Sequence, residues 1–207
     1  MCGIAGQVGR DPRTIQSRYA AYCAMQQTLA RRGPDHQGLW ADGALLFGQR
    51  RLAVLDLSAR SNQPLLDPEL GLALVFNGSI YNYQQLRQTL QQRGYRFFSS
   101  GDSEVILKAY AAWGAACVEH LIGVFAFAIW DQRQRCLFLA RDRLGIKPLY
   151  YSAHANVFRF ASNTQALLEA PEVDTSLDAV ALHYQLTLHG VVPAPHTILQ
   201  GIRKLPP

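Results

Sequence analysis

Residue 2 of the chain is a cysteine that directly follows Met1. A second residue this small favours removal of the methionine, which would leave Cys2 with both a thiol and a free α-amine. An ordinary cysteine, with a pKa of about 8.5, is only slightly ionised at pH 7 and needs a base to act as a nucleophile. An α-amine, with a pKa of about 7.7–8.0, can accept that proton. Cys2 could therefore supply nucleophile and base together, although a thiol in this position can also simply pack.

Four further residues have side chains or backbone groups that suit the chemistry of an α-amino acid: Arg51, Asn77, Gly78 and Asp102. An arginine can hold a carboxylate through two hydrogen bonds, and an aspartate can accept from an ammonium group. An asparagine amide and a glycine N–H are both donors of the kind that stabilise an oxyanion. Each residue also has a plainer interpretation, as a surface ion pair, an ordinary Asn-Gly turn or a helix cap. The sequence alone does not bring them together.

The composition excludes several other classes of function. The chain has 207 residues, of which 49% are hydrophobic and 17% charged, as in an ordinary globular protein. The net charge of +5 comes from scattered Arg and Lys residues, which argues against nucleic-acid binding. No apolar run is long enough to cross a membrane, and no signal peptide is evident. The four cysteines and six histidines have no metal-site spacing, so we expect no metal and a cytoplasmic protein with reduced thiols.

Hydrophobic patterning predicts several strands interleaved with pairs of helices, which favours a layered α+β fold over strict βαβ alternation. The expected strands cover residues 3–8, 45–47, 52–55, 72–76, 97–98, 123–130, 136–140, 149–152 and 158–161. The expected helices cover residues 15–30, 82–93, 104–113 and about 179–188, the last after a capping sequence at 175–178. Asn77-Gly78 is expected to form a turn, and Asp102 to lie in a loop before its helix.

Seven sequence blocks together resemble the class II glutamine amidotransferase domain of asparagine synthetases. They are MCGIAG (1–6), RGPD (32–35), RRLAVLDLS (50–58), FNGSIYN (76–82), GDSE (101–104), GVFAFA (123–128) and ARDRLGIKPLYY (140–151). The blocks follow the order of the family and extend over essentially the whole chain. The resemblance implies a four-layer αββα sandwich of the N-terminal-nucleophile hydrolase type.

The resemblance also implies a role for each candidate residue. Cys2 matches the nucleophile and its α-amine the base, while Asn77 and Gly78 match the oxyanion hole. Arg51 matches the residue that holds the α-carboxylate of glutamine, and Asp102 the residue that holds its α-ammonium. The implied reaction is hydrolysis of glutamine to glutamate and ammonia, which needs neither a metal nor a nucleotide.

Ser79 departs from the family pattern. The family usually has a glutamate after Asn-Gly, where it helps to hold the substrate ammonium, whereas a serine supplies no charge. We therefore expect weaker glutamine binding, with Asp102 as the main anionic contact. A non-acidic residue at this position, together with residues 95–102 and 192–199, is similar to one branch of the family, the enzymes that resemble N-acetylglutaminylglutamine amide synthase.

Family members continue into an ATP-using synthetase domain with a Ser-Gly-Gly-x-Asp-Ser phosphate loop, which this sequence does not contain. We predict a glutaminase domain at residues 1–190 and a proline-rich connecting segment at 191–207. The expected partners are glutamine and a synthetase domain in the same or another chain, which would need ATP and Mg²⁺, and a homodimer is possible. The alternative is a non-catalytic relic that binds glutamine or docks onto a synthetase.

Overall fold

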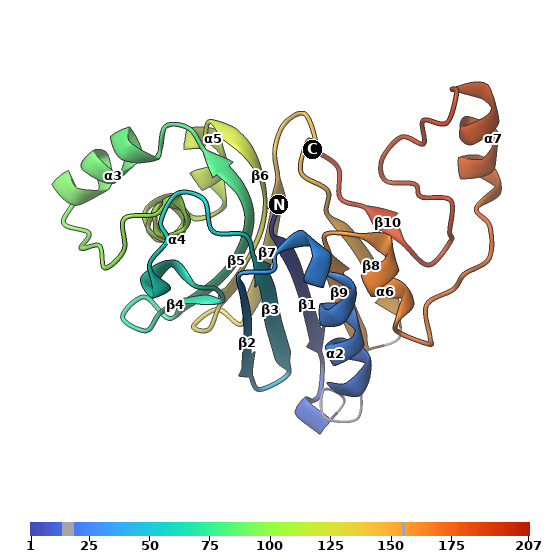
Figure 1. Ribbon diagram of the computed structural model, residues 1–207, viewed down its shortest axis with the longest axis horizontal. Coiled ribbons are helices and arrows are strands. Elements are labelled where there is room, and N and C mark those ends of the chain that lie inside the picture. Colours follow the sequence, from blue (N-terminus) through green and yellow to red (C-terminus); the bar gives the residue numbers. More distant parts are fainter. Residues whose placement is uncertain (14–18, 155) are drawn as a thin grey trace.

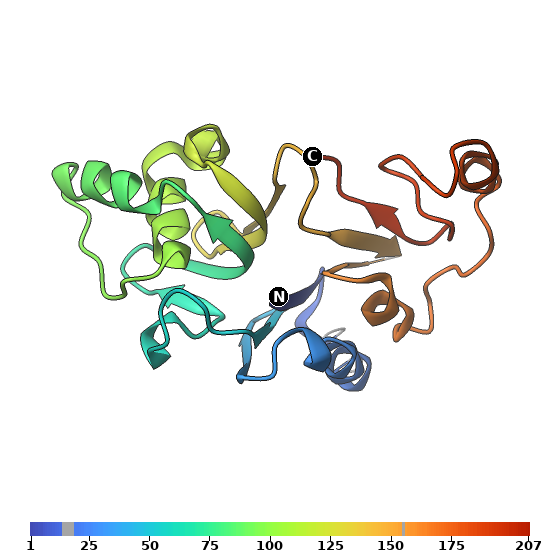
Figure 2. The same ribbon diagram turned by 45° about the horizontal axis from the view of Figure 1, so that its top comes forward.

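Two antiparallel sheets packed face to face form the centre of the molecule, with helices on both outer sides (Figure 1). The computed structural model describes residues 1–13, 19–154 and 156–207. Both views place the N-terminus between the two halves of the molecule, where the sheets meet (Figures 1 and 2). The predicted α+β sandwich with αββα layers is confirmed.

The six-stranded sheet has the strand order β10-β8-β9-β1-β3-β2. Its members are β1 (Gly3–Gly9), β2 (His36–Asp42), β3 (Leu45–Arg51), β8 (Tyr150–His154), β9 (Val157–Ala161) and β10 (Arg203–Lys204). In its centre β1 pairs with β3, so that Gly3 lies opposite Arg50 and Ile4 opposite Gln49. A Cβ atom on Gly6 would lie 2.2 Å from the Phe160 ring, which explains the glycine in the middle of β1.

The four-stranded sheet has the order β4-β5-β6-β7. Its members are β4 (Leu65–Asp67), β5 (Leu72–Ile80), β6 (Gly123–Asp131) and β7 (Cys136–Arg141). β6 pairs with the whole of β5, whereas the short β4 pairs only with residues 72–74. Among the described residues, no strand pairs with the rest of that edge of β5, and this edge becomes one wall of the site described below.

Side chains that alternate along the strands fill the space between the sheets. Ile4, Leu45 and Phe47 of the first sheet pack in one cluster with Ala73 and Val75 of β5. The alternate residues of β5 point the other way, toward the outer helices, as Phe76 does. Because of this alternation, Asn77 lies on the same face of β5 as Val75 and so faces the six-stranded sheet.

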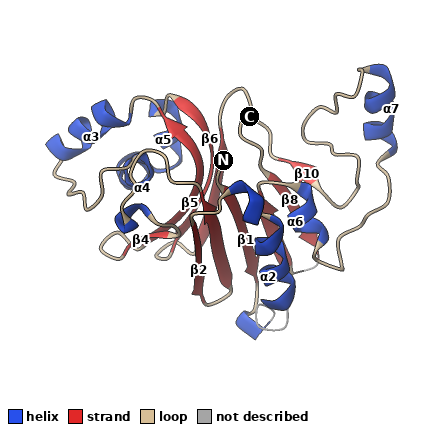
Figure 3. Cartoon of the chain, in the orientation of Figure 1, coloured by secondary structure: helices blue, strands red, loops and turns tan. Residues whose placement is uncertain are grey.

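Helices cover the outer face of each sheet (Figure 3). The helices of the six-stranded sheet are α2 (Tyr19–Thr28) and α6 (Thr164–Leu168); those of the four-stranded sheet are α3 (Tyr83–Gln92), α4 (Asp102–Trp113) and α5 (Cys117–His120). Short 3₁₀ helices occur at Ala30–Arg32, Ala59–Ser61 and Gly114–Ala116. α7 (Ala179–Thr187) lies at the periphery, and its N-cap Asp178 accepts a hydrogen bond from the Ala181 N–H.

Three local expectations from the sequence are wrong. Residues 52–55 form a loop and not a strand, because β3 ends at Arg51 and the side chains of Val54 and Leu55 are exposed. Asn77 and Gly78 form no turn, since β5 continues through them in register with β6. Residues 97–98 form no strand. A short apolar run or an Asn-Gly pair does not determine the local structure by itself, because tertiary context overrides such local preferences.

The other expected elements agree with the structure more closely, whereas β2, β4, β10, α5 and α6 were not predicted. α3 ends before Gly94, whose φ of 92° is a left-handed conformation that favours glycine. α4 begins at Asp102 and not at residue 104, and the start of the expected helix at 15–30 falls partly on residues outside the described ranges. In the proline-rich segment, β10 pairs with β8 and Ile202 is buried in the core, so this segment packs against the sheet. A domain boundary at 190 stays a prediction.

Candidate active site

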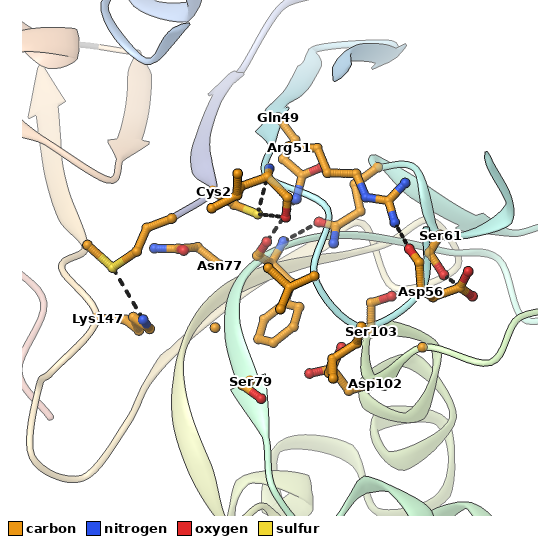
Figure 4. Close-up of a pocket in the computed structure, with 18 residues that line it drawn as sticks. Cys2, Gln49, Arg51, Asp56, Ser61, Asn77, Ser79, Asp102, Ser103 and Lys147 are labelled. Carbon is orange, nitrogen blue, oxygen red and sulfur yellow. Dashed lines mark hydrogen bonds between the residues drawn. The ribbon is translucent and has the colours of Figure 1, made fainter. Parts of the chain in front are cut away.

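All six predicted site residues line one pocket of about 270 Å³ at the end of the two sheets: Cys2, Arg51, Asn77, Gly78, Ser79 and Asp102 (Figure 4). They come from β3, β5, α4 and the residue just before β1, which are far apart in the sequence. The structure thus shows that these six residues share one site, which the sequence alone does not establish. The chemical role of each residue stays a prediction at this point.

Cys2 directly precedes β1 and is half-buried at the pocket. The Leu52 N–H donates to Cys2 Sγ at 3.3 Å, and Sγ lies 3.5 Å from the Leu52 carbonyl oxygen. Arg32 Nε donates to the Cys2 carbonyl at 3.0 Å and fixes the backbone beside it. The thiol is therefore held in place by the loop after β3, in a position open to the pocket. All four cysteines are free thiols.

The open edge of β5 presents every second backbone N–H to the pocket side. The Phe76 N–H donates to Gln63 Oε1 at 2.6 Å, and the Ile80 N–H donates to Asp102 Oδ2 at 2.9 Å. Since N–H groups alternate in direction along a strand, the N–H of Gly78 between them points to the same edge. Gly78 therefore directs a backbone donor at the pocket it lines.

The pairing with β6 supports this direction. Gly78 lies opposite Phe125, whose own N–H and C=O are used by Asp142: the N–H donates to Asp142 Oδ2 at 3.2 Å, and the C=O accepts from the Asp142 N–H at 2.8 Å. A Cβ atom on residue 78 would lie 2.3 Å from the Val124 carbonyl oxygen. Only glycine fits this close approach of the two strands.

Asn77 provides a second donor beside Gly78. Its side chain is buried, with 1% exposure, and lines the pocket. Among the described residues none accepts a hydrogen bond from its Nδ2. A side-chain N–H and a backbone N–H from consecutive residues therefore border the same pocket as the Cys2 thiol, the arrangement that an oxyanion requires.

Arg51 is buried at the end of β3 and holds the loop that follows it. Its Nη1 donates to the Ser58 carbonyl at 3.0 Å and to Asn62 Oδ1 at 2.6 Å, and its Nη2 donates to the Asp56 carbonyl. A guanidinium has five N–H donors, and these contacts with described residues use three. Arg51 therefore both shapes the pocket wall and places a cation in it.

Asp56, which the sequence analysis did not single out, connects this loop to the N-terminus of α4. Its carboxylate accepts from the Ser58 N–H at 2.9 Å, from Ser61 Oγ at 2.7 Å, and from both the N–H and Oγ of Ser100, at 3.1 and 2.9 Å. The hydrogen bonds from Ser58 and Ser61 hold the pKa of Asp56 well below its usual range. The charged carboxylate thus ties together the two segments that carry Arg51 and Asp102.

Asp102 is the first residue of α4 and is 7% exposed. Burial raises the pKa of Asp102 above its ordinary value of 3.8, while the hydrogen bond from the Ile80 N–H and those from the helix N-terminus oppose the rise. Ser79 lies between Gly78 and Ile80 on β5 and is partly buried. Its side chain and the Asp102 carboxylate line the same side of the pocket (Figure 4).

Sequence reasoning also missed Gln49, Gln63 and Lys147, which line the pocket. Gln49 could have been found, because residues two apart on a strand share a face and Arg51 had already been singled out. Lys147 could not, since its loop is far away in the sequence; its Nζ lies 3.3 Å from the Met1 Sδ. Met1 itself lines the pocket, with 58% of its surface exposed.

The described residues contain no group of three or more His, Cys, Asp or Glu side chains that could hold a metal ion. Within the same ranges, no helix is long and apolar enough to cross a membrane.

Comparison with known proteins identifies the family of the chain. A family model for the glutamine amidotransferase domain matches residues 1–207. The chain belongs to this family. Asparagine synthetase [glutamine-hydrolyzing] 3 of Bacillus subtilis is 38% identical to this amidotransferase domain over 212 residues, which cover 100% of the domain and 34% of the relative. Asparagine synthetase [glutamine-hydrolyzing] 1 of the same organism is 35% identical over 208 residues, which cover 100% of the domain and 32% of the relative.

The fold of the amidotransferase domain is also found in solved structures. The glutamine phosphoribosylpyrophosphate amidotransferase of Bacillus subtilis superimposes with a TM-score of 0.63 and 24% identity, over 80% of this chain and 43% of that one. The family model and the Bacillus subtilis relatives confirm the resemblance to the asparagine synthetase family, whereas the narrower amide synthase branch stays a prediction. The domain spans about a third of the length of the asparagine synthetases to which it is similar.

Proposed function

We propose that this amidotransferase domain hydrolyses L-glutamine to glutamate and ammonia, with Cys2 as nucleophile. The observation that carries the proposal is the pocket itself, where the Cys2 thiol, two adjacent donors at Asn77 and Gly78, and the charges of Arg51 and Asp102 meet. Each end of a glutamine molecule finds a group of matching chemistry in this arrangement.

The reaction requires Cys2 to be the first residue of the mature chain. Removal of Met1 frees the α-amine of Cys2, which takes the thiol proton as the sulfur attacks the carboxamide carbon. A C–S bond forms, the carbonyl oxygen becomes an oxyanion, and Asn77 Nδ2 and the Gly78 N–H donate to it. When the tetrahedral intermediate collapses, the C–N bond breaks and the ammonium group of Cys2 protonates the leaving nitrogen, which departs as ammonia.

Water completes the cycle. The α-amine accepts a proton from the water molecule, whose oxygen attacks the thioester carbon. The C–S bond then breaks, glutamate is released, and the sulfur takes back the proton. No oxidant, metal or nucleotide enters these steps.

The remaining pocket residues would hold the amino-acid part of the substrate. Arg51 is proposed to bind the α-carboxylate through the N–H groups that none of the described residues accepts from, and Asp102 to accept from the α-ammonium. Ser79 supplies a hydroxyl where the family pattern has a carboxylate. These contacts are alike in substrate and transition state, so they act mainly on substrate affinity.

The names of the relatives support a proposal for the fate of the ammonia. Both Bacillus subtilis relatives are named as glutamine-hydrolysing asparagine synthetases, and the domain matches a third of each. We therefore propose that the ammonia passes to an ATP- and Mg²⁺-dependent amidation domain in the same or a second chain. The acceptor could be aspartate or another carboxylate, and a homodimer stays an expectation.

A glutamate-release assay tests the proposal. Protein with Met1 removed should release glutamate and ammonia in equal amounts from glutamine, and Cys2→Ala should not, although it keeps the fold. If the wild-type protein binds glutamine without releasing glutamate, the domain is the non-catalytic relic. Thermal unfolding of both proteins provides the control for folding.

A further inference from the structure

Two buried amide side chains border the pocket, and each has a buried polar atom without a partner among the described residues. Asn77 Nδ2 lacks an acceptor and Gln49 Oε1 lacks a donor among the described residues, and the two side chains are 1% and 0% exposed. Both residues line the pocket, on facing sheets (Figure 4). A buried polar atom without a partner costs free energy, so the pair points to a ligand that completes both hydrogen bonds.

The orientation of the Gln49 amide is fixed by its other contact. Gln49 Nε2 donates to the Phe76 carbonyl at 2.9 Å, which is the peptide group just before Asn77. A carbonyl oxygen can only accept, so the nitrogen of the amide must face Phe76 and the oxygen must be the free end. Gln49 thus reaches from β3 across to β5 and keeps one acceptor for the pocket.

One buried donor and one buried acceptor match a primary carboxamide, which has one carbonyl oxygen and one NH₂ group. We propose that Gln49 Oε1 accepts a hydrogen bond from the carboxamide NH₂ of the substrate, while Asn77 Nδ2 donates to its carbonyl. Gln49 is then the residue that makes the pocket specific for a carboxamide. This inference rests on the proposed hydrolysis of glutamine and assigns the part of the pocket that recognises the reacting group.

Glutamate, the product of the reaction, fits this pair of groups less well than glutamine does. A carboxylate at the same place has oxygen acceptors on both sides and no N–H for Gln49. A bound glutamate would therefore place a carboxylate oxygen against Gln49 Oε1 in a buried site, and two acceptors facing each other without a hydrogen are unfavourable. A site that hydrogen-bonds a substrate N–H rejects analogues that lack it. Gln49 would help the enzyme to release glutamate and bind the next glutamine.

Binding to the Cys2→Ala protein tests this without turnover. Calorimetry gives the dissociation constants of L-glutamine, L-glutamate and 2-amino-5-oxohexanoate, the methyl ketone in which CH₃ replaces NH₂. With Gln49 in place, the ketone should bind about ten- to a hundredfold more weakly than glutamine. This first measurement needs no change at position 49, so a folding defect cannot obscure it.

Substitutions of Gln49 provide the second part of the binding test. Gln49→Met keeps the size but removes both polar atoms, and should reduce the preference for glutamine over glutamate and over the ketone by about ten- to a hundredfold. Gln49→His should restore most of the preference, because a neutral imidazole also has one donor and one acceptor. Gln63→Met is the matched control: it removes the bond to the Phe76 N–H and so loosens the same peptide from the other side, but should keep the preference.

The outcomes separate this inference from the proposed function. If glutamine and the ketone bind equally well to Cys2→Ala protein, or if Gln49→Met leaves both preferences unchanged, the role of Gln49 is wrong even though the wild-type enzyme releases glutamate. A Gln49→Met variant with unchanged preferences but a lower kcat would show that Oε1 serves another group, such as the Cys2 α-amine. If the wild-type protein releases no glutamate, the proposed function itself fails.

Discussion

The Asp102 carboxylate accepts a hydrogen bond from the Ile80 N–H at 2.9 Å and so joins the N-terminus of α4 to the open edge of β5. This bond lies two residues beyond Gly78, whose N–H points to the same edge. The residue proposed to bind the substrate ammonium and the residue proposed to bind the oxyanion are therefore positioned by one strand. Their spacing is set by the rigid backbone of β5, which favours precise placement of a small substrate.

The proposed oxyanion hole predicts a kinetic signature for Asn77. Asn77→Ala should lower kcat for glutamine hydrolysis by roughly 10²–10³ with a smaller change in KM, because this contact forms chiefly in the transition state. Arg51→Ala should instead raise KM, since Arg51 is proposed to hold the α-carboxylate equally in the bound substrate and in the transition state. Steady-state kinetics of both variants checks this. A rise in KM alone for Asn77→Ala would place Asn77 outside the oxyanion hole.

The raised pKa of Asp102 predicts a pH dependence of substrate binding. The ammonium of glutamine needs the charged carboxylate, which is lost as the pH falls through a pKa that burial has raised above 3.8. KM should therefore begin to rise on acidification at a higher pH than an ordinary aspartate would give. A plot of KM against pH across the acidic range should show this rise, the acidic limb of the profile, in the wild type. Asp102→Asn should have a high KM without the limb; a limb that persists in this variant would assign it to another group.

Ser79 gives the clearest test of how this pocket departs from the family pattern. A charge-assisted hydrogen bond contributes about 1.5–3 kcal/mol, so Ser79→Glu should lower KM for glutamine by roughly ten- to a hundredfold if the pocket has room. The double variant Ser79→Glu with Asp102→Asn should also be less impaired than Asp102→Asn alone. An unchanged or higher KM in a folded Ser79→Glu protein would remove residue 79 from the binding of the substrate ammonium.

Asp56 should matter for activity although it need not touch the substrate. Asp56→Ala removes the hydrogen bonds from Ser58, Ser61 and Ser100, and so releases the loop held by Arg51 from the N-terminus of α4. We expect KM to rise more than kcat falls, because the binding groups lose their relative position. Asp174→Ala is the matched control, since Asp174 likewise accepts from the N–H and Oγ of a serine, Ser176, but does not line the pocket. Equal effects of the two changes would show that Asp56 acts only on general stability.

Much of the fold, and six of the residues that line the pocket, could be predicted because strong local patterns coincide with a family resemblance. Residues 72–76 of β5 and 123–130 of β6 are continuous apolar runs, and α3 has apolar residues at helical spacing with a glycine after its end. Local patterns failed where pairing decided the outcome. The Asn77-Gly78 pair is typical of a turn, but β6 lies so close that glycine is required in an extended strand.

The contacts within the site could not be predicted because they join distant segments. Nothing near Asp56 in the sequence indicates that its carboxylate accepts from Ser100, and nothing near Gln49 indicates that its amide reaches Phe76. Such contacts depend on how the two sheets and the N-terminus of α4 pack. The sequence identifies several groups that could take part in the reaction, and the packing explains how they are held in place.

The central claim is that Cys2 acts as an N-terminal nucleophile. A fusion protein with a cleavable segment before Cys2 tests it most directly, because the same molecules can be assayed before and after cleavage exposes the α-amine. We predict that the uncleaved protein releases almost no glutamate, that activity appears in proportion to the fraction cleaved, and that a cleaved Cys2→Ala fusion stays inactive. Equal glutamate release before and after cleavage would contradict the account.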